Sequence, residues 1–131
     1  MKRGEAARCG GSPRCSDCRI RKGEIYYANL SPVVGSEMDK RRPVLIVSND
    51  ANNSAASTVT ILPITSNVSR VYPFEVLLNP EESGLSKPSK VQAQQVRTIS
   101  KQRILGDGVG CLNQDLMQLV DAVLKLHLGL G

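Results

Sequence analysis

The chain has 131 residues, 40% of them hydrophobic, and a formal net charge of +5. This length suits one domain with a modest core and is too short for two. Residues 1–22 hold seven basic and two acidic side chains, whereas the rest of the chain holds ten of each. The body of the chain is therefore neutral, and its overall charge points to no partner. Any site for an anion must be local.

Several classes of protein are excluded by composition. No apolar run reaches the roughly 18 residues of a membrane span, and the basic N-terminus is not followed by the apolar stretch of a signal peptide. We therefore expect a cytoplasmic protein without a membrane partner. The chain has three Tyr, one Phe and no Trp. Its core must rest on Val, Leu and Ile, and aromatic platforms for stacking bases are few.

Residues 1–20 are predicted to be a flexible basic extension, because they contain almost no large apolar side chains. A misread start or an appended sequence is an equally open interpretation. Within this segment Cys15 and Cys18 have the C-x-x-C spacing of a zinc site. A tetrahedral site needs four ligands, and beyond the extension the chain offers only Cys111 and His127. We expect no metal and no other cofactor.

After the extension, short apolar runs separated by turn residues predict β-strands. The predicted strands are residues 23–30, 43–48, 58–64 and 73–80, and residues 89–100 alternate with a phase slip that predicts a bulge or two short strands. In the first strand, Ile25 and Tyr27 share one face, and Tyr26, Ala28 and Leu30 share the other. Polar segments at residues 33–41, 49–54 and 81–88 are predicted as a loop and two turns.

The C-terminal part predicts one amphipathic helix. Its apolar stripe consists of Leu112, Leu116, Leu119, Val120, Val123 and Leu124. Asn113 is the predicted N-cap, Leu112 and Met117 are predicted to pack across it, and Gly129 ends the helix. Together these elements predict a mostly β fold, a small curled barrel with the C-terminal helix packed on it.

Five blocks of sequence carry a resemblance to a known family. They are GEIYYANLSPVVGSE, RPVLIVSND, PITSN, QVRTISKQRIL and VDAVLKLHL. In order and approximate spacing they resemble the MazF/PemK family of toxin endoribonucleases, over about residues 21–128. The resemblance implies an SH3-like barrel for residues 21–131 and a homodimer. It also implies sequence-specific, metal-independent cleavage of single-stranded RNA such as mRNA, which inhibits translation and growth. A cognate antitoxin with a flexible, acidic C-terminal segment would neutralise it.

Two residues match the positions to which the family's catalysis is assigned, Arg42 in the RPV block and Thr65 in the ITS block. A guanidinium at the start of a buried strand presents a bidentate fork to phosphate with little entropy left to lose. Because it stays protonated, we expect it not to serve as a base. Its expected role is to stabilise the transition state, with protonation of the leaving oxygen as a further candidate role. Thr65 can donate a hydrogen bond to a phosphate oxygen. Glu37 is the candidate base or orienting group for Arg42, with a solvated ion pair as the alternative.

The candidate RNA-binding residues surround these positions. They are Ser36, Lys40, Arg41, Ser66, Gln95 and Arg97. Lys40 and Arg41 would attract phosphate, or else form a solvated loop. Gln95 and Arg97 resemble the family's substrate-facing wall, where amides read unpaired bases, although Arg97 could instead pair with a carboxylate across the sheet. His127 is the only histidine, so a ribonuclease that uses two histidines is excluded, and we expect it to be structural.

Two other functions fit the same fold. CcdB-type toxins use this barrel to bind a topoisomerase and cleave nothing, and a degenerate family member would retain only antitoxin binding. The joint presence of Arg42 and Thr65 favours the nuclease, because a pure binding module has no reason to carry both.

Overall fold

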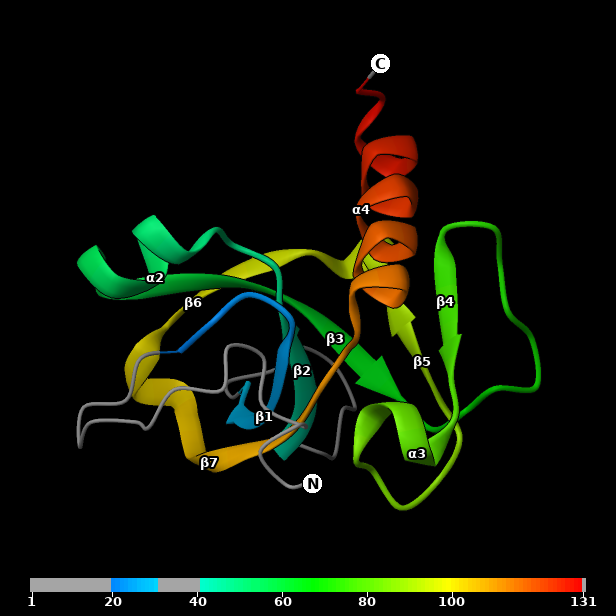
Figure 1. Ribbon diagram of the computed structural model, residues 1–131, viewed down its shortest axis with the longest axis horizontal. Coiled ribbons are helices and arrows are strands. Elements are labelled where there is room, and N and C mark those ends of the chain that lie inside the picture. The colour runs from blue at the N-terminus through cyan, green and yellow to red at the C-terminus, as the bar shows by residue number, and fades with distance from the viewer. Residues whose placement is uncertain (1–19, 31–40, 131) are drawn as a thin grey trace.

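The computed structural model describes residues 20–30 and 41–130, and in this part of the chain antiparallel strands precede a long C-terminal helix (Figure 1). The strands are β1 (Glu24–Asn29), β2 (Arg41–Ile46), β3 (Thr58–Thr65), β4 (Glu75–Leu78), β5 (Ser89–Gln92), β6 (Arg97–Ser100) and β7 (Ile104–Cys111). The helices are α2 (Asp50–Ala55), α3 (Pro80–Ser83) and α4 (Gln114–Leu128), with short 3-10 turns η1 (Ala93–Gln95) and η2 (Lys101–Arg103).

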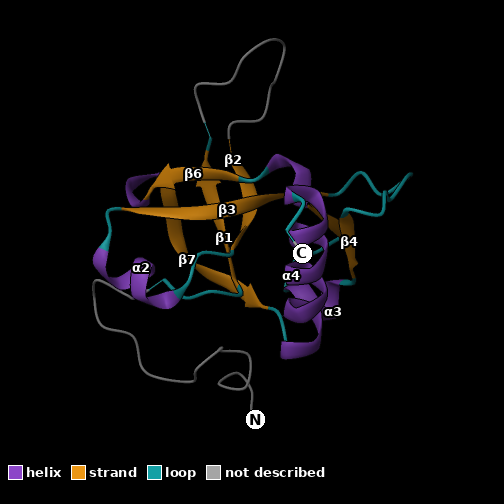
Figure 2. Ribbon diagram, turned by 90° about the horizontal axis from the view of Figure 1, so that it is seen from above, coloured by secondary structure: helices purple, strands orange, loops and turns teal. Residues whose placement is uncertain are grey.

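Strand β3 organises the sheet, whose order is β4-β5-β3-β2-β1-β7. One edge of β3 pairs with β2, and the other pairs first with β6 and then, at its end, with β5. Figure 2 shows β3 and β6 running together across the sheet. The mostly β antiparallel fold with a terminal helix is confirmed. Among the described strands no pairing joins β7 to β4 or β6, so closure into a barrel stays a prediction.

Helix α3 links β4 and β7, the two outermost strands of the sheet, which do not pair with each other. It follows β4 directly and packs against β7. The contact is between backbones, because a Cβ added at Gly110 would lie 2.0 Å from the Ser83 carbonyl oxygen. Gly84, at φ +80°, would likewise place a Cβ 2.2 Å from the Val109 oxygen. Only glycine allows this approach at either position.

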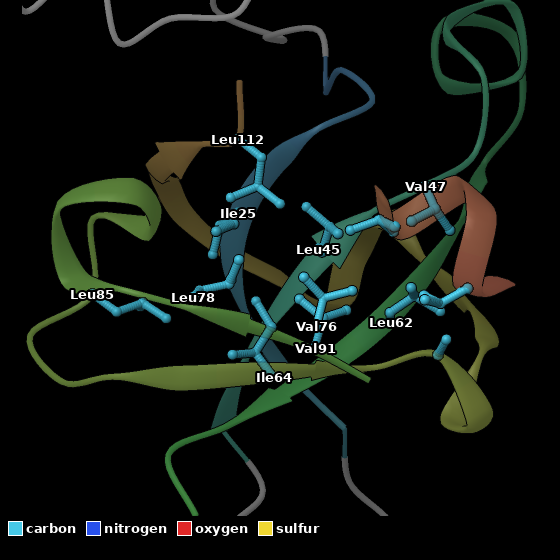
Figure 3. Packing of buried hydrophobic residues seen from close by; sticks show 13 residues of the cluster. Ile25, Leu45, Val47, Leu62, Ile64, Val76, Leu78, Leu85, Val91 and Leu112 are labelled. Carbon is cyan, nitrogen blue, oxygen red and sulfur yellow. The ribbon is translucent and has the colours of Figure 1, made fainter. Parts of the chain in front are cut away.

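The sheet has an apolar cluster on each face. Cluster 1 comprises Ile25, Leu45, Val47, Leu62, Ile64, Val76, Leu78, Leu85, Val91, Ala93, Leu112, Val120 and Val123 (Figure 3). Cluster 2 comprises Tyr26, Ala28, Leu30, Val44, Ile46, Val59, Ile61 and Ile99. Consecutive residues of β1 fall alternately into the two groups, as period-two alternation requires. The predicted faces of the first strand are thereby confirmed. Helix α4 contributes Val120 and Val123 to cluster 1 and contacts β4 and η1, and Figure 2 shows it beside β4.

Two polar segments predicted as turns form short helices at residues 50–55 and 80–83, whereas residues 84–88 lie outside helices and strands. Asn49 caps α2 by accepting a hydrogen bond at Oδ1 from the Asn52 amide, 2.8 Å. Asn79 and Glu82 form a capping box at the start of α3, with Pro80 in the first turn. The prediction was wrong because Asn and Pro favour helix starts as well as turns. The second strand also begins earlier than predicted, at Arg41, and Pro43 pairs with Tyr27 inside it.

The later elements agree better. Residues 89–100 form two short strands, β5 and β6, as the phase slip predicted. Strand β7 was not predicted at all. Helix α4 begins where expected, because Asn113 Oδ1 accepts from the Leu116 amide, 2.8 Å, and Gly129 ends it in the left-handed conformation. Leu119 is a correction, since it is 49% exposed and lies outside the core. None of the described helices has the length and apolar character to cross a membrane.

Candidate active site

Arg42 and Thr65 belong to the paired strands β2 and β3. Their register matches Val44 with Pro63. The recorded pairing ends at that position, and the same register extended by two residues would set Arg42 across from Thr65. Residues opposite one another in an antiparallel pair have their side chains on the same face. The two residues thus share the face that bears cluster 2 further along the strands.

Both side chains have hydrogen-bonding capacity to spare. Arg42 is half-buried beside the small side chain of Ala28, and no carboxylate in residues 20–30 or 41–130 lies within ion-pair distance of it. Thr65 is also half-buried, and its Oγ1 accepts a hydrogen bond from the Asn67 amide, 3.2 Å. The hydroxyl proton is therefore still available for donation. A fixed cation beside a hydroxyl donor suits a phosphate oxygen.

Arg41 points to the other face of the sheet. Its guanidinium carbon lies 4.4 Å from the ring centroid of Tyr27, and Tyr27 packs against cluster 1. Successive residues of a strand project to opposite sides, so Arg41 and Arg42 do not form one basic patch. The other candidates of this loop, Ser36, Glu37 and Lys40, lie outside the described residues.

The remaining candidates lie around Thr65 at different distances. Ser66 follows it directly and is exposed. Arg97 is opposite Ile61 on β3, four residues before Thr65, or roughly 13 Å along the strand. It is exposed and forms no ion pair with a described carboxylate. Gln95 is exposed on η1.

The structure also positions two groups considered for other roles. His127 is exposed in the last turn of α4, and its ring centroid is 6.5 Å from that of Phe74. In the part of the chain that the structure describes, no three His, Cys, Asp or Glu side chains come together as metal ligands would. Cys15 and Cys18 lie outside that part.

A buried ion pair next to Thr65 was missed by the sequence analysis. Glu75, at the start of β4, binds Lys90 of β5 with Oε1 2.8 Å from Nζ, and their side chains are 1% and 9% exposed. Burial acts most strongly on the pKa of Glu75 and raises it. Hydrogen bonds from Gln94, Lys90 and the Tyr72 amide, with the charge of Lys90, together outweigh burial and hold that pKa below its ordinary value. The only signal in the sequence was a carboxylate at the head of an apolar strand.

Comparison with known proteins decides the family. The model of the PemK-like, MazF-like toxins of type II toxin–antitoxin systems matches residues 21–128. The chain belongs to this family. The MazF-like toxin is 40% identical over 116 residues to Endoribonuclease MazF9 of Mycobacterium tuberculosis, covering 85% of this chain and 98% of the relative. It is 37% identical over 112 residues to Endoribonuclease EndoA of Bacillus subtilis, covering 85% and 96%.

Solved structures agree with this assignment. A mycobacterial endoribonuclease in complex with its cognate antitoxin superposes with a TM-score of 0.71 at 27% identity, over 86% of this chain and 97% of that one. MazF (Form-I) of Deinococcus radiodurans superposes with a TM-score of 0.70 at 27% identity, over 84% and 96%. The family resemblance read from the five sequence blocks is thereby confirmed.

Proposed function

We propose that this MazF-like endoribonuclease toxin cleaves single-stranded RNA, such as mRNA, at the end of β2 and β3 where Arg42 and Thr65 meet, and that it needs no metal ion. The supporting observation is the β2–β3 register, which directs both side chains to one face. Each has donors that no described residue uses. The site can therefore hold a phosphate between a guanidinium and a hydroxyl.

The chemistry follows from what RNA offers. The ribose 2′ oxygen attacks phosphorus and loses its proton, and the bond to the 5′ oxygen breaks as that oxygen gains a proton, for which Arg42 is the candidate donor. Arg42 stabilises the charge that builds up on the nonbridging oxygens, and Thr65 donates a hydrogen bond to one of them. Glu37 is the candidate to accept the 2′ proton, or to orient Arg42. Ser36, Lys40, Ser66, Gln95 and Arg97 are the proposed contacts to the rest of the strand.

Incubation with a long unstructured RNA, with and without EDTA, tests this proposal. We expect cleavage at defined sequences in both conditions. Thr65→Val, which removes the hydroxyl while keeping the shape, should slow cleavage about tenfold or more, whereas Thr65→Ser should retain most activity. Complete inhibition by EDTA would refute the metal-independent mechanism. Equal rates for the Val and Ser variants would remove Thr65 from it.

The same experiment separates the alternatives. A CcdB-like toxin would leave the RNA intact and bind a topoisomerase, and a degenerate member would leave the RNA intact and bind only an antitoxin. Neither explains why Arg42 and Thr65 share one face of paired strands and both have spare donors, and we therefore favour the nuclease.

Neutralisation is proposed to use the same site. Relatives have been solved in complex with an antitoxin. In this chain, an antitoxin with a flexible, acidic C-terminal segment would fold across Arg42 and exclude RNA. Inhibition should then be competitive with RNA and weaken as salt rises. Calorimetry at two salt concentrations measures the second effect, and an affinity that does not change with salt would contradict it.

We further propose an SH3-like barrel that works as a homodimer. Exposed leucines support association, since Leu119 and Leu126 are 49% and 62% exposed and lie seven residues apart on one side of α4. Sedimentation at micromolar concentration should give twice the chain mass of 14.2 kDa. A single species of the chain mass would contradict the dimer.

A further inference from the structure

The Glu75–Lys90 pair is costly to bury, so its retention calls for an explanation. Removing two charges from water costs several kcal/mol per ion, of the order that their attraction returns, and apolar side chains of similar size often do as well. Stability alone is therefore a weak reason to keep the pair. Its neighbours suggest a different one.

Both members of the pair bind the backbone of the connection between β3 and β4, residues 66–74. Lys90 Nζ donates to the Arg70 carbonyl oxygen at 2.6 Å. Glu75 Oε1 accepts from the Tyr72 amide at 3.0 Å, and the Glu75 amide donates to the Tyr72 carbonyl oxygen at 2.9 Å. In Figure 1 this connection swings away from the end of β3 and returns beside β4. The pair thus holds the second half of the connection, around Arg70 and Tyr72, in place.

The pair also lies in line with the candidate active site. Lys90 is opposite Thr65 in the β3–β5 register and opposite Leu77 in the β4–β5 register. With the β2–β3 register extended to Arg42, four residues follow one another across one face of the sheet: Arg42 of β2, Thr65 of β3, Lys90 of β5 and Leu77 of β4. Lys90 is the next position after the hydroxyl that is proposed to contact phosphate.

The first half of the connection is bound to the Thr65 hydroxyl. Thr65 Oγ1 accepts from the Asn67 amide at 3.2 Å, and Asn67 Oδ1 accepts from the Ser69 hydroxyl at 2.9 Å. The next residue is Arg70, whose carbonyl Lys90 holds. Residues 66–69 are thus tied at Thr65 on one side and at Lys90 on the other.

A third tie reaches the other proposed RNA contact. Gln94 Nε2 donates to Glu75 Oε2 at 2.7 Å, and the next residue on η1 is the exposed Gln95. Phe74 also accepts at its carbonyl oxygen from the Ala93 amide, 3.3 Å. The same carboxylate therefore fixes the 66–74 connection and the turn that presents Gln95.

We propose that Glu75 and Lys90 are positioning residues for RNA cleavage, because their buried pair holds residues 66–74 and η1 against Thr65 and so shapes the wall that selects the nucleotides flanking the cut. This inference rests on the proposed function. Neither side chain contacts the RNA, and both act through the backbone and through Gln94.

The test replaces both charges by apolar side chains of similar length, Glu75→Met with Lys90→Met. No charge is left unpaired, so the fold should persist with a Tm within about 5 °C of the parent. The ties to Arg70, Tyr72 and Gln94 are lost. We expect KM for the preferred oligonucleotide to rise about tenfold, kcat to change less, and the sequences at the cut ends of a long RNA to become more varied.

The matched control is the exposed pair Lys22–Asp121, 3.2 Å apart, changed to Lys22→Met with Asp121→Met. It loses a lysine–carboxylate pair that lies away from the connection, and it should keep the parental KM and cut sequences. If the Glu75/Lys90 double variant also keeps them, the positioning role is wrong. If the parent itself does not cleave RNA, the proposed function fails instead, and the two failures are distinct.

If the double variant does not fold, a second variant still tests the proposal. Gln94→Leu removes one tie and leaves the ion pair in place. It should relax sequence selection in the same direction by a smaller factor, and hydrogen exchange at the Tyr72 amide should show whether the 66–74 connection has loosened. Unchanged cut sequences in a folded Gln94→Leu protein would overturn the link from Glu75 to η1.

Discussion

Two polar regions on the same face of the sheet differ in burial and in how fully their side chains are hydrogen-bonded. Arg42 and Thr65 are half-buried and have donors that no described residue uses. Glu75 and Lys90 are almost fully buried, the carboxylate with three donors and the ammonium with two acceptors. Groups with spare donors suit a ligand, whereas matched groups hold other parts of the chain in place. Changes in the first region should cost activity, and single changes in the second should first cost stability.

The largest expected effect comes from removing one member of the buried Glu75–Lys90 pair. Glu75→Ala leaves the Lys90 ammonium buried without its counter-charge. The free energy of unfolding should fall by about 3 kcal/mol, measured by urea denaturation. A loss below about 1 kcal/mol would mean that Lys90 reaches water easily, and the contrast between the two regions would weaken.

Arg42→Ala tests the other side of the comparison. Cleavage should fall roughly 100-fold, the usual loss for one fixed charge donor, while Tm stays nearly unchanged. Arg42→Lys should also be poorly active, because it keeps the charge without the bidentate fork. Lys125→Ala, at an exposed position in the last turn of α4, is the control. Full activity of Arg42→Lys would reduce the role of Arg42 to that of a point charge.

Lowering the pH tests the buried pair without a mutation, because it protonates the Glu75 carboxylate. The pKa of Glu75 in the folded chain lies below the ordinary value of 4.5. Its carboxylate therefore contributes stability that is fully present above the unfolded pKa and is lost as pH falls through the folded one. The difference in unfolding free energy between the parent and Glu75→Gln should be constant near neutral pH and shrink below about pH 4.5. A difference that stays constant down to pH 2.5 would refute this.

The smallest effect belongs to the exposed pair. Lys22 and Asp121 are 36% and 44% exposed at the side chain, where solvent screens the attraction. Asp121→Asn should change the free energy of unfolding by less than about 1 kcal/mol, and added salt should reduce even that. A loss as large as that of Glu75→Ala would show that burial does not separate the two pairs.

The parts of the fold that could be read from the sequence have strong local signals. The alternation of β1 and the Asn113 cap of α4 each specify an element within a few residues. The segments that became α2 and α3 carry Asn, Ser and Pro, which suit turns and helix starts equally. Strand β7 contains Gly106, Gly108 and Gly110, which lower strand propensity, and it exists because β1 pairs with it from far along the chain.

The candidate site shows the same division. Arg42 and Thr65 could be named from the family resemblance, but their shared face follows from a register between two strands. The opposite directions of Arg41 and Arg42 also required that Arg41 belong to β2, where the sequence predicted a loop. Glu75 and Lys90 look like ordinary solvent-facing positions in short strands. Both are buried in the folded chain, where each binds the backbone of residues 66–74.

The pairing of β1 with β7 has a consequence for synthesis of the toxin on the ribosome. Glu24 pairs with Cys111 and Ala28 with Ile104, so one edge of an early strand waits for residues made near the end of translation. Strands β2 and β3, with Arg42 and Thr65, leave the ribosome well before that edge is covered. An uncovered edge offers unpaired amides and carbonyls to other chains. A nascent chain that stops before Ile104 thus carries the proposed catalytic pair on an incomplete sheet that is prone to aggregation. We therefore expect truncated copies of the chain to yield little active toxin.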